Sequence, residues 1–118
     1  MWYRHTGWQD GSDRWVNTTG MKVGSDWDFE NVFVGGNGVI YGLKSNGDLY
    51  WFRHDGWQNG SNQWANGGNG IKIASGWDVK TAFSDSKGLI YGVKPNGDLH
   101  LYRHISYRLA RWNQSLGQ

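Results

Sequence analysis

Tryptophans in polar loops are the residues best suited to chemistry in this sequence. Among the nine tryptophans, Trp8 and Trp57 stand in glycine-flanked polar loops rather than in apolar runs, so we expect some of the set to be exposed. A flat indole can stack on the apolar C–H face of a sugar, while neighbouring carboxylates, amides or backbone N–H groups bind the sugar hydroxyls. Packing between repeated structural units is the alternative role for any single tryptophan.

Three histidines each follow an arginine, at His5, His54 and His104. Equivalent positions of a repeat lie far apart, so these imidazoles could share a metal ion only if all of them faced a common axis. We therefore expect each ring to be held by a backbone group or by a carboxylate such as Asp55. Hydrogen bonding to a sugar is the alternative, with His54 as the candidate. We predict no metal site and no cofactor.

The carboxylates do not form a repeated pair. A glycosidase needs two carboxyl groups roughly 5–9.5 Å apart across one bond. Asp28/Asp78 and Asp48/Asp98 recur, but Asp48 and Asp98 directly follow Asn-Gly and are typical of a turn. With no cysteine, dense calcium loop, phosphate loop or Ser-His-Asp signature, the sequence predicts that the protein is not an enzyme. Carboxylates replaced in the second half of the chain are found at Asp10/Asn59, Asp13/Asn62, Asp26/Gly76 and Glu30/Lys80.

The elements that must position these residues come from a tandem repeat. Residues 2–50 align with residues 51–100, and the second copy is one residue longer in the loop at 66–70. A period of about 50 residues falls in the range of propeller blades and of solenoids. The recurring tryptophan pairs are Trp8/Trp57, Trp15/Trp64 and Trp27/Trp77.

Each repeat contains four short runs rich in β-branched and aromatic residues, a composition that favours strands. Asn37-Gly38 and Asn46-Gly47 separate neighbouring runs, and Asn-Gly between apolar runs indicates a hairpin because the turn requires positive φ. The sequence therefore predicts an all-β protein made of β-propeller blades with four antiparallel strands each. The runs, by place in the blade, are 30–34 and 80–84, then 39–43 and 89–93, then 49–54, 99–104 and 2–5, then 20–23 and 70–73.

The order of these runs predicts how the chain assembles. If the four places in a blade are numbered 1 to 4 in the order just given, the runs follow one another along the chain as 3-4-1-2-3-4-1-2-3. Residues 1–104 therefore hold two tandem repeats (2–50 and 51–100) and part of a third. About two blades per chain cannot close a ring, and an open propeller leaves sheet edges and an apolar face uncovered. We therefore expect a ring closed by homo-oligomerisation, as a cyclic dimer or trimer, in which one chain's N-terminal strands complete another chain's C-terminal sheet.

The tail, the net charge and the lack of long apolar runs limit the kinds of partner that we expect. Residues 105–118 form a tail outside the repeat, in which 105–112 could form a helical turn or two. A net charge of +2 is too small for a nucleic-acid footprint, and no apolar run approaches the ~20 residues of a membrane span. The N-terminal residues lack the apolar segment of a signal peptide. We predict neither nucleic-acid binding nor membrane insertion, and localisation stays open, with secretion or action at a cell surface included.

The order of motifs resembles the blade of tachylectin-2-type β-propeller lectins over residues 2–104. The resemblance rests on Gly-x-Trp before an aromatic-rich strand, then on Asn-Gly-Val-Ile-Tyr-Gly-Leu, Asp-Leu-Tyr, Ser-Asn-Gln-Trp and Ile-Lys-Ile. The Arg-His-Asp-Gly-Trp-Gln loop is more similar to bacterial relatives than to the animal lectin. The spacing that fits such a blade is set by Trp27, Phe33, Tyr41, Leu49 and Trp64.

This resemblance implies a non-catalytic, carbohydrate-binding lectin that recognises N-acetylated hexosamines such as GlcNAc or GalNAc. It implies sites between adjacent blades, made multivalent by ring assembly. The family's known propeller closes five blades within one chain, whereas this chain has two repeats. The alternative is a propeller with a protein-interaction or structural role, an engineered or fragmentary one included. The implied sugar-binding residues are Asp13, Trp15, Trp27, Asn62, Trp64 and Trp77, with Trp8, Trp57 and His54 as secondary candidates.

Overall fold

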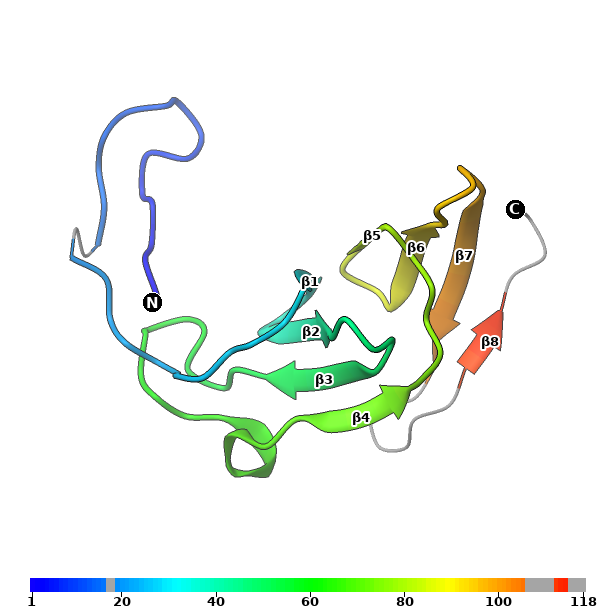
Figure 1. Ribbon diagram of the computed structural model, residues 1–118. Coiled ribbons are helices and arrows are strands. Elements are labelled where there is room, and N and C mark those ends of the chain that lie inside the picture. The colour runs from blue at the N-terminus through cyan, green and yellow to red at the C-terminus, as the bar shows by residue number, and fades with distance from the viewer. Residues whose placement is uncertain (17–18, 106–111, 115–118) are drawn as a thin grey trace.

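The chain forms two antiparallel sheets, each of four strands in sequence order (Figure 1). The computed structural model describes residues 1–16, 19–105 and 112–114. The first sheet contains β1 (Asn31–Gly36), β2 (Val39–Leu43), β3 (Leu49–Arg53) and β4 (Ile71–Ala74), with a short 3-10 helix η1 (Ala65–Gly68) before β4. The second sheet contains β5 (Thr81–Ser84), β6 (Leu89–Val93), β7 (Leu99–His104) and β8 (Trp112–Gln114).

Tight turns with positive φ join the strands. Between β1 and β2, Asn37 and Gly38 have φ values of 52° and 84°, as an Asn-Gly hairpin turn requires. Between β2 and β3, the backbone N–H of Asp48 donates to Asn46 Oδ1 at 3.0 Å. Asp98 makes the same bond, at 2.9 Å, to the asparagine two residues before it. The interpretation of Asp48 and Asp98 as turn residues is confirmed.

The two sheets repeat one register. Tyr41 of β2 pairs with Trp51 of β3, and at the equivalent place Tyr91 of β6 pairs with Leu101 of β7. The runs predicted between residues 30 and 104 all form strands, with ends that agree to within two residues. The prediction of an all-β chain with antiparallel four-stranded sheets is therefore confirmed.

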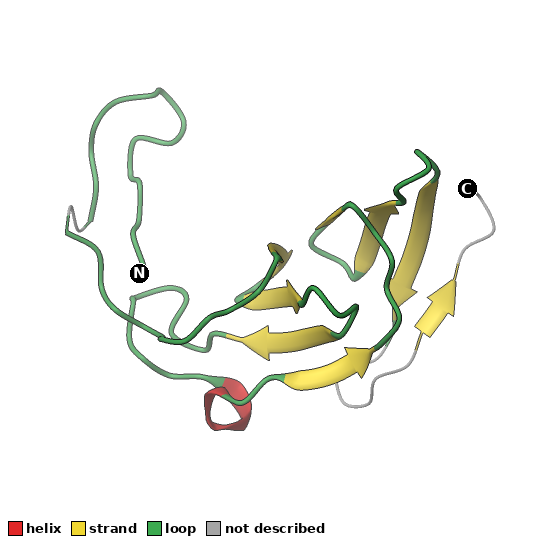
Figure 2. Cartoon of the chain, in the orientation of Figure 1, coloured by secondary structure: helices red, strands yellow, loops and turns green. Residues whose placement is uncertain are grey.

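The N-terminal copy differs from the prediction. Strands were expected at 2–5 and 20–23, but the structure shows only isolated bridges, between Trp2 and Met21 and between His5 and Trp15. Trp2 and Met21 exchange both backbone hydrogen bonds, at 2.6 and 2.8 Å. The prediction of full strands is wrong because a two-stranded ribbon without a neighbouring strand is barely stable in water. Figure 2 shows this segment as loop.

The C-terminal tail contributes a strand to the second sheet. β8 pairs antiparallel with β7, with Tyr102 opposite Gln114 and His104 opposite Trp112. The helical turn predicted over 105–112 is therefore wrong at residue 112, and residues 106–111 lie outside the described residues. β8 lies on the edge expected to wait for another chain, but it pairs with residues 102–104 of β7, whereas β4 pairs with residues 49–51 of β3. The repeat gave no signal for β8 because the sequence pattern breaks after His104.

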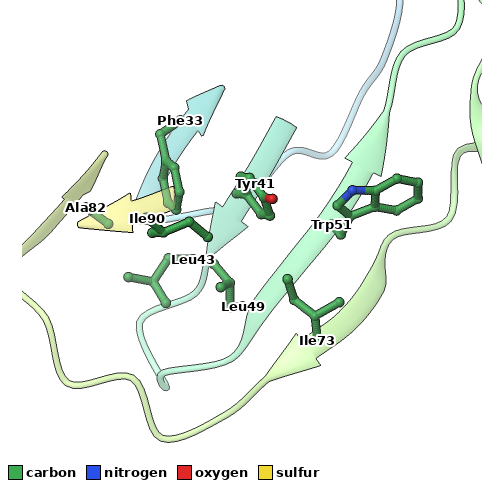
Figure 3. Packing of buried hydrophobic residues seen from close by; sticks show 8 residues of the cluster. All are labelled: Phe33, Tyr41, Leu43, Leu49, Trp51, Ile73, Ala82 and Ile90. Carbon is green, nitrogen blue, oxygen red and sulfur yellow. The ribbon is translucent and has the colours of Figure 1, made fainter. Parts of the chain in front are cut away.

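One apolar cluster joins the two sheets (Figure 3). Leu49 of β3 and Ile90 of β6 are fully buried, and such burial is worth roughly 1.5–3 kcal/mol for each side chain. β1 and β5 are linked across the sheets where Asn31 Nδ2 donates to the carbonyl of Ala82 at 3.1 Å. This packing fixes the second sheet against one face of the first. The buried members of the cluster are Phe33, Tyr41, Leu43, Leu49, Trp51, Ile73, Ala82 and Ile90.

The described part of the chain does not close into a ring. Val34 of β1, Phe83 of β5 and Leu99 of β7 remain exposed. A single chain therefore leaves apolar strand positions in contact with solvent. Within the described residues, no helix has the length and apolar character needed to span a bilayer.

Candidate functional site

Two tryptophans from neighbouring units of the repeat meet beside the first sheet. Trp27 lies in the segment that leads into β1, and Trp64 lies in the loop between β3 and η1. Their ring centroids are 5.6 Å apart with planes at 44°, and Phe52 of β3 lies 4.5 Å from Trp27. A connecting segment of one unit and a long loop of the next thus form one aromatic surface.

Hydrogen bonds and stacking hold the Trp64 indole in place. Its Nε1–H group donates to the carbonyl of Val23 at 2.8 Å and to Oδ1 of Asn62 at 3.0 Å. Its ring stacks on His54, with centroids 4.6 Å apart and planes 26° apart. His54 is 4% exposed, and its Nε2 lies 2.8 Å from the carbonyl oxygen of Ser61. Trp64 is therefore a fixed wall, supported by a buried histidine.

A cavity of about 360 Å³ lies beside these two indoles. Trp27, Trp64 and Ser25 line it, together with apolar side chains that include Val32 and Ile40. This volume lies within the ~300–1,000 Å³ of small-molecule sites, which combine apolar walls with a few polar groups. The amide nitrogen of nearby Asn62 carries two donors that its bond to Trp64 does not use. The cavity can accept a ring with one apolar face and polar substituents.

His5 and His54 have backbone carbonyl groups, and not a carboxylate, as their hydrogen-bond partners. His5 repeats the geometry of His54, because its Nε2 lies 2.6 Å from the carbonyl oxygen of Ser12 and its ring 4.5 Å from Trp15. Asp55, expected as a possible partner, instead accepts a hydrogen bond from Arg53 Nε at 2.8 Å. The prediction of an Asp55 partner is therefore wrong, and the prediction of a backbone partner is confirmed for His5 and His54.

The loop that carries Trp15 has the same internal geometry as the loop that carries Trp64, but in the described residues no tryptophan faces Trp15 as Trp27 faces Trp64. Trp15 Nε1–H donates to Asp13 Oδ1 at 2.7 Å, as Trp64 does to Asn62. Trp15 is 39% exposed, and in the described part of the chain its ring neighbours are His5 and Tyr3. Asp13 and Trp15 are thus paired with each other but lie apart from the cavity beside Trp64.

The second sheet repeats part of this aromatic arrangement. Trp77 stacks against Tyr102 with ring centroids 4.4 Å apart, which repeats the contact of Trp27 with Phe52. In the backbone pairing, Trp112 opposite His104 takes the place that Trp64 has opposite His54. The structure therefore brings together Trp27, Asn62 and Trp64 of the predicted set. It separates Asp13 and Trp15 from Trp77.

The two secondary tryptophan candidates lie outside the cavity. Trp8 is 72% exposed and Trp57 is 39% exposed, so the predicted exposure of this pair is confirmed. Trp57 lies against the β1–β2 turn, where a Cβ on Gly38 would come 2.7 Å from its ring. Its carbonyl accepts a hydrogen bond from Trp2 Nε1–H at 2.9 Å, which ties the N-terminal segment to the first sheet.

The carboxylate of Asp10 organises its loop. Asp10 accepts the backbone N–H of Ser12 at 2.9 Å, and this bond lowers the pKa of the carboxyl. At the equivalent place, Asn59 accepts the N–H of Ser61 at 3.0 Å. An amide can replace the carboxylate because the loop requires only an acceptor. In the described residues, no three side chains of His, Cys, Asp or Glu gather as a metal site would require.

Three features of this site escaped the sequence prediction. Phe52 supports Trp27, the carbonyl of Val23 fixes Trp64, and Ser25 lines the cavity. Phe52 could have been found because it aligns with Tyr102, an aromatic residue in the same strand position. A backbone carbonyl carries no sequence signal, and the serine has none beyond its place next to Trp27.

Comparison with known proteins agrees with this geometry. A family model described as Tachylectin matches residues 1–117, nearly the whole chain. A search of curated proteins gives no match. The family indicates a lectin, with a carbohydrate-binding and generally non-catalytic role. The chain belongs to the Tachylectin family.

Proposed function

We propose that this protein binds N-acetylated hexosamine-type sugars, such as GlcNAc or GalNAc, in the cavity beside Trp27 and Trp64. The observation that carries the proposal is the pair of indoles, 5.6 Å apart, at a cavity of about 360 Å³. A pyranose can stack its C–H face on an indole while the Asn62 amide and the Ser25 hydroxyl bind its polar groups. The apolar side chains of Val32 and Ile40 suit the methyl of an acetamido group.

Calorimetric titration tests this proposal. GlcNAc, GalNAc and glucose are titrated into the wild-type chain, and we expect the acetamido sugars to bind more tightly. Trp64→Ala should lower the affinity of this site about 10-fold or more, as truncation of a central binding tryptophan does. Asn62→Ala tests the polar partner while leaving the indole in place.

The control is Trp8→Ala, because Trp8 is 72% exposed and lies outside the cavity. The proposal predicts wild-type affinity for this variant. If GlcNAc-agarose retains none of the protein and a glycan array shows no binding, the lectin proposal fails. A structural or protein-interaction propeller would then be the remaining function.

We further propose that two tandem repeats, 2–50 and 51–100, form propeller blades that close into a ring between copies of the chain. Trp15 of one copy would displace β8 of another copy and take the place beside Trp77 and Tyr102 that Trp64 takes beside Trp27 and Phe52. Each copy carries one half of this composite site, and the repeat gives the halves matching geometry. A cyclic dimer or trimer would then present two sites per chain on one rigid frame.

Ring assembly would raise avidity for a glycan-coated surface. Several weak sites on one frame can bind ~10²–10⁴ times more tightly than a single site without any new contact. Native mass spectrometry with and without GlcNAc measures both the copies per ring and the sugars per copy. A single-chain mass at micromolar concentration would exclude the ring, while binding at the Trp64 cavity would still be measurable by titration.

A further inference from the structure

The second sheet repeats, on its outer face, an aromatic pair that the first sheet buries. On the first sheet, Phe33 stacks on Tyr41 with ring centroids 5.3 Å apart and planes 23° apart. On the second sheet, Phe83 stacks on Tyr91 at 5.2 Å and 18°. Phe33 is 8% exposed, whereas Phe83 is 49% exposed. The outer aromatic pair, Phe83 and Tyr91, therefore has the geometry of a packed interface, but no sheet in the described part of the chain covers it.

The buried pair shows what covers such rings. Phe33 and Tyr41 pack in one cluster with Ala82 of β5 and Ile90 of β6 (Figure 3). Ala82 is 5% exposed and Ile90 is fully buried. An aromatic pair on the first two strands of one sheet thus packs against an aliphatic pair on the first two strands of the next sheet.

The outer aliphatic pair, Val32 and Ile40, is the uncovered counterpart on the first sheet. These residues have the repeat positions of Ala82 and Ile90, but Val32 is 48% exposed and Ile40 is half-buried. Each is next in its strand to a buried aromatic residue, so it points to the opposite face of the sheet. One chain therefore carries both halves of a second junction between sheets, on its two outer faces. A cyclic assembly brings two such halves together between copies.

A hydrogen bond crosses the junction within the chain, and an equivalent acceptor lies at the outer face. The Tyr41 hydroxyl lies 3.0 Å from His104 Nδ1. His54 has the repeat position of His104, and the backbone N–H of each donates to a glycine carbonyl in a hairpin turn, at 2.7 and 2.8 Å. His54 Nε2 lies 2.8 Å from the carbonyl oxygen of Ser61. This contact assigns the hydrogen to Nε2, which leaves Nδ1 of His54 as an acceptor for an O–H group.

We propose that the outer aromatic pair of one copy packs on the outer aliphatic pair of the neighbouring copy, and that Tyr91 donates a hydrogen bond to His54 Nδ1 there. This proposal rests on the ring proposed above and names the faces and the polar contact that close it. Phe83 and Val32 are each about half exposed in a single chain, and such a junction would bury both. Burial of apolar surface is the main favourable contribution to most protein association.

The same contact would complete the sugar site beside Trp64. His54 stacks on Trp64 with ring centroids 4.6 Å apart, so a hydrogen bond to His54 holds the ring behind this indole. Val32 and Ile40 line the cavity of about 360 Å³ beside Trp64. The outer aromatic pair of the neighbouring copy would therefore bound the apolar side of this cavity. Tyr91 is a positioning residue in this arrangement, because it acts on the sugar through His54 and Trp64.

Sedimentation velocity tests the packing of the two faces. Phe83→Asp and Val32→Asp each place a charge on one outer face, and we expect each variant to be folded with the mass of one copy. Phe83→Leu is the matched control and should keep the mass of the wild-type ring. A mixture of Phe83→Asp and Val32→Asp should form a two-copy species, because each variant keeps the face that the other lacks. If Phe83→Asp keeps the mass of the ring, or the mixture stays at one copy, the packing is overturned.

The chemical shift of His54 Nδ1, measured by nitrogen NMR in the assembled protein, tests the hydrogen bond. Tyr91→Phe removes the donor but keeps the aromatic ring, so the chains should still assemble while the His54 signal moves. Tyr41→Phe is the matched control and should move the signal of His104 instead. Tyr91→Phe should also weaken GlcNAc binding about 2–10-fold, the range expected for one neutral hydrogen bond. An unchanged His54 signal overturns the contact, and wild-type affinity for GlcNAc overturns its positioning role.

The ring and this contact can fail separately. A wild-type chain with the mass of one copy would exclude both, while GlcNAc titration would still test the cavity beside Trp64. A wild-type oligomer in which Tyr91→Phe leaves the His54 signal unchanged would exclude this contact alone.

Discussion

Tyr41 and Tyr91 occupy one repeat position but have different environments. Tyr41 is 2% exposed, and its hydroxyl lies 3.0 Å from His104 Nδ1. Tyr91 is only half-buried. The difference arises because the second sheet covers the face of the first sheet on which Tyr41 lies. In the described part of the chain, no further sheet covers the equivalent face of the second sheet, on which Tyr91 lies. Position in the array, and not residue type, decides which tyrosine becomes part of the core.

The environment of Tyr41 predicts a loss of stability at high pH. Burial, with a smaller effect of the negative charge on Asp85, raises its pKa to about 12, against about 10 in an unfolded chain. The folded state thus favours the neutral phenol, so its contribution is complete below about pH 10 and is lost as the pH rises towards 12. A difference of this size corresponds to ~2–3 kcal/mol.

Urea unfolding at pH 8 and pH 11 measures this effect. The wild type and Tyr41→Phe should differ in how much unfolding free energy they lose between the two pH values, with the smaller loss in Tyr41→Phe. Tyr91→Phe serves as the control at the same repeat position. An unchanged pH dependence in Tyr41→Phe would contradict the assignment.

Leu49 and Leu99 give a second matched comparison. Leu49 is fully buried whereas Leu99 is 47% exposed, although both begin the third strand of their sheet. Leu49→Ala leaves a cavity in the cluster and should cost ~2–5 kcal/mol of unfolding free energy. Leu99→Ala should cost much less in a single chain. Comparable losses in thermal or urea unfolding would show that Leu99 is also covered, as it would be within a closed ring.

At the level of elements, local turn chemistry explains what the sequence could predict. Asn-Gly at 37–38, 46–47 and 96–97 marks hairpins whatever lies around it, so the strands that these turns join, β1 to β3 and β6 to β7, were predictable. The lack of full strands at 2–5 and 20–23 was not predictable, because a strand also requires a neighbouring strand. β8 has no counterpart in the sequence repeat and pairs with β7 through backbone groups. Backbone pairing of this kind leaves little trace in composition.

The residues of the site also divide into those that could be predicted from the sequence and those that could not. Trp27, Asn62 and Trp64 were named from the resemblance to the lectin blade, and the structure brings these three residues together. The separation of Trp15 from Trp77 was not predictable, since it depends on where the array stops in a single chain.

β8 predicts that the tail controls association. β8 pairs with residues 102–104 of β7, and His104 faces Trp112 as His5 faces Trp15, so β8 occupies the edge where another chain's Trp15 would bind in a ring. Removing residues 106–118 exposes this edge, and an unpaired edge is a template for another strand. We expect the truncated chain to sediment at a larger mass than the full chain at equal concentration. Asn113→Pro should act in the same direction, because proline cannot donate to a strand ladder.

The outcome that contradicts this role is specific. If the truncated chain stays folded, as judged by its β-sheet circular dichroism, and keeps the mass of one copy, β8 does not compete with association. A loss of circular dichroism would show instead that β8 holds the second sheet together. Asn113→Pro, which keeps the chain length, then separates the two roles.

At the scale of the whole molecule, the proposed ring makes one sugar site out of two chains. Trp15 and Asp13 lie on the N-terminal unit, while Trp77 and Tyr102 lie on the second sheet. Trp15→Ala and Trp77→Ala should each abolish the composite site while leaving the cavity beside Trp64 intact. Each variant should therefore bind about half as many GlcNAc molecules per chain as the wild type, which has two sites per chain in a closed ring.

Mixing the two variants tests whether the site is shared. A junction is restored only where Trp15 comes from a Trp77→Ala chain and Trp77 comes from a Trp15→Ala chain. Random assembly of an equal mixture produces this combination at about a quarter of the junctions, whatever the number of copies in the ring. The mixture, unfolded and refolded together, should thus bind more GlcNAc per chain than either variant refolded alone. Equal binding would show that Trp15 and Trp77 do not meet across chains, because a site contained within one chain cannot be rescued by another.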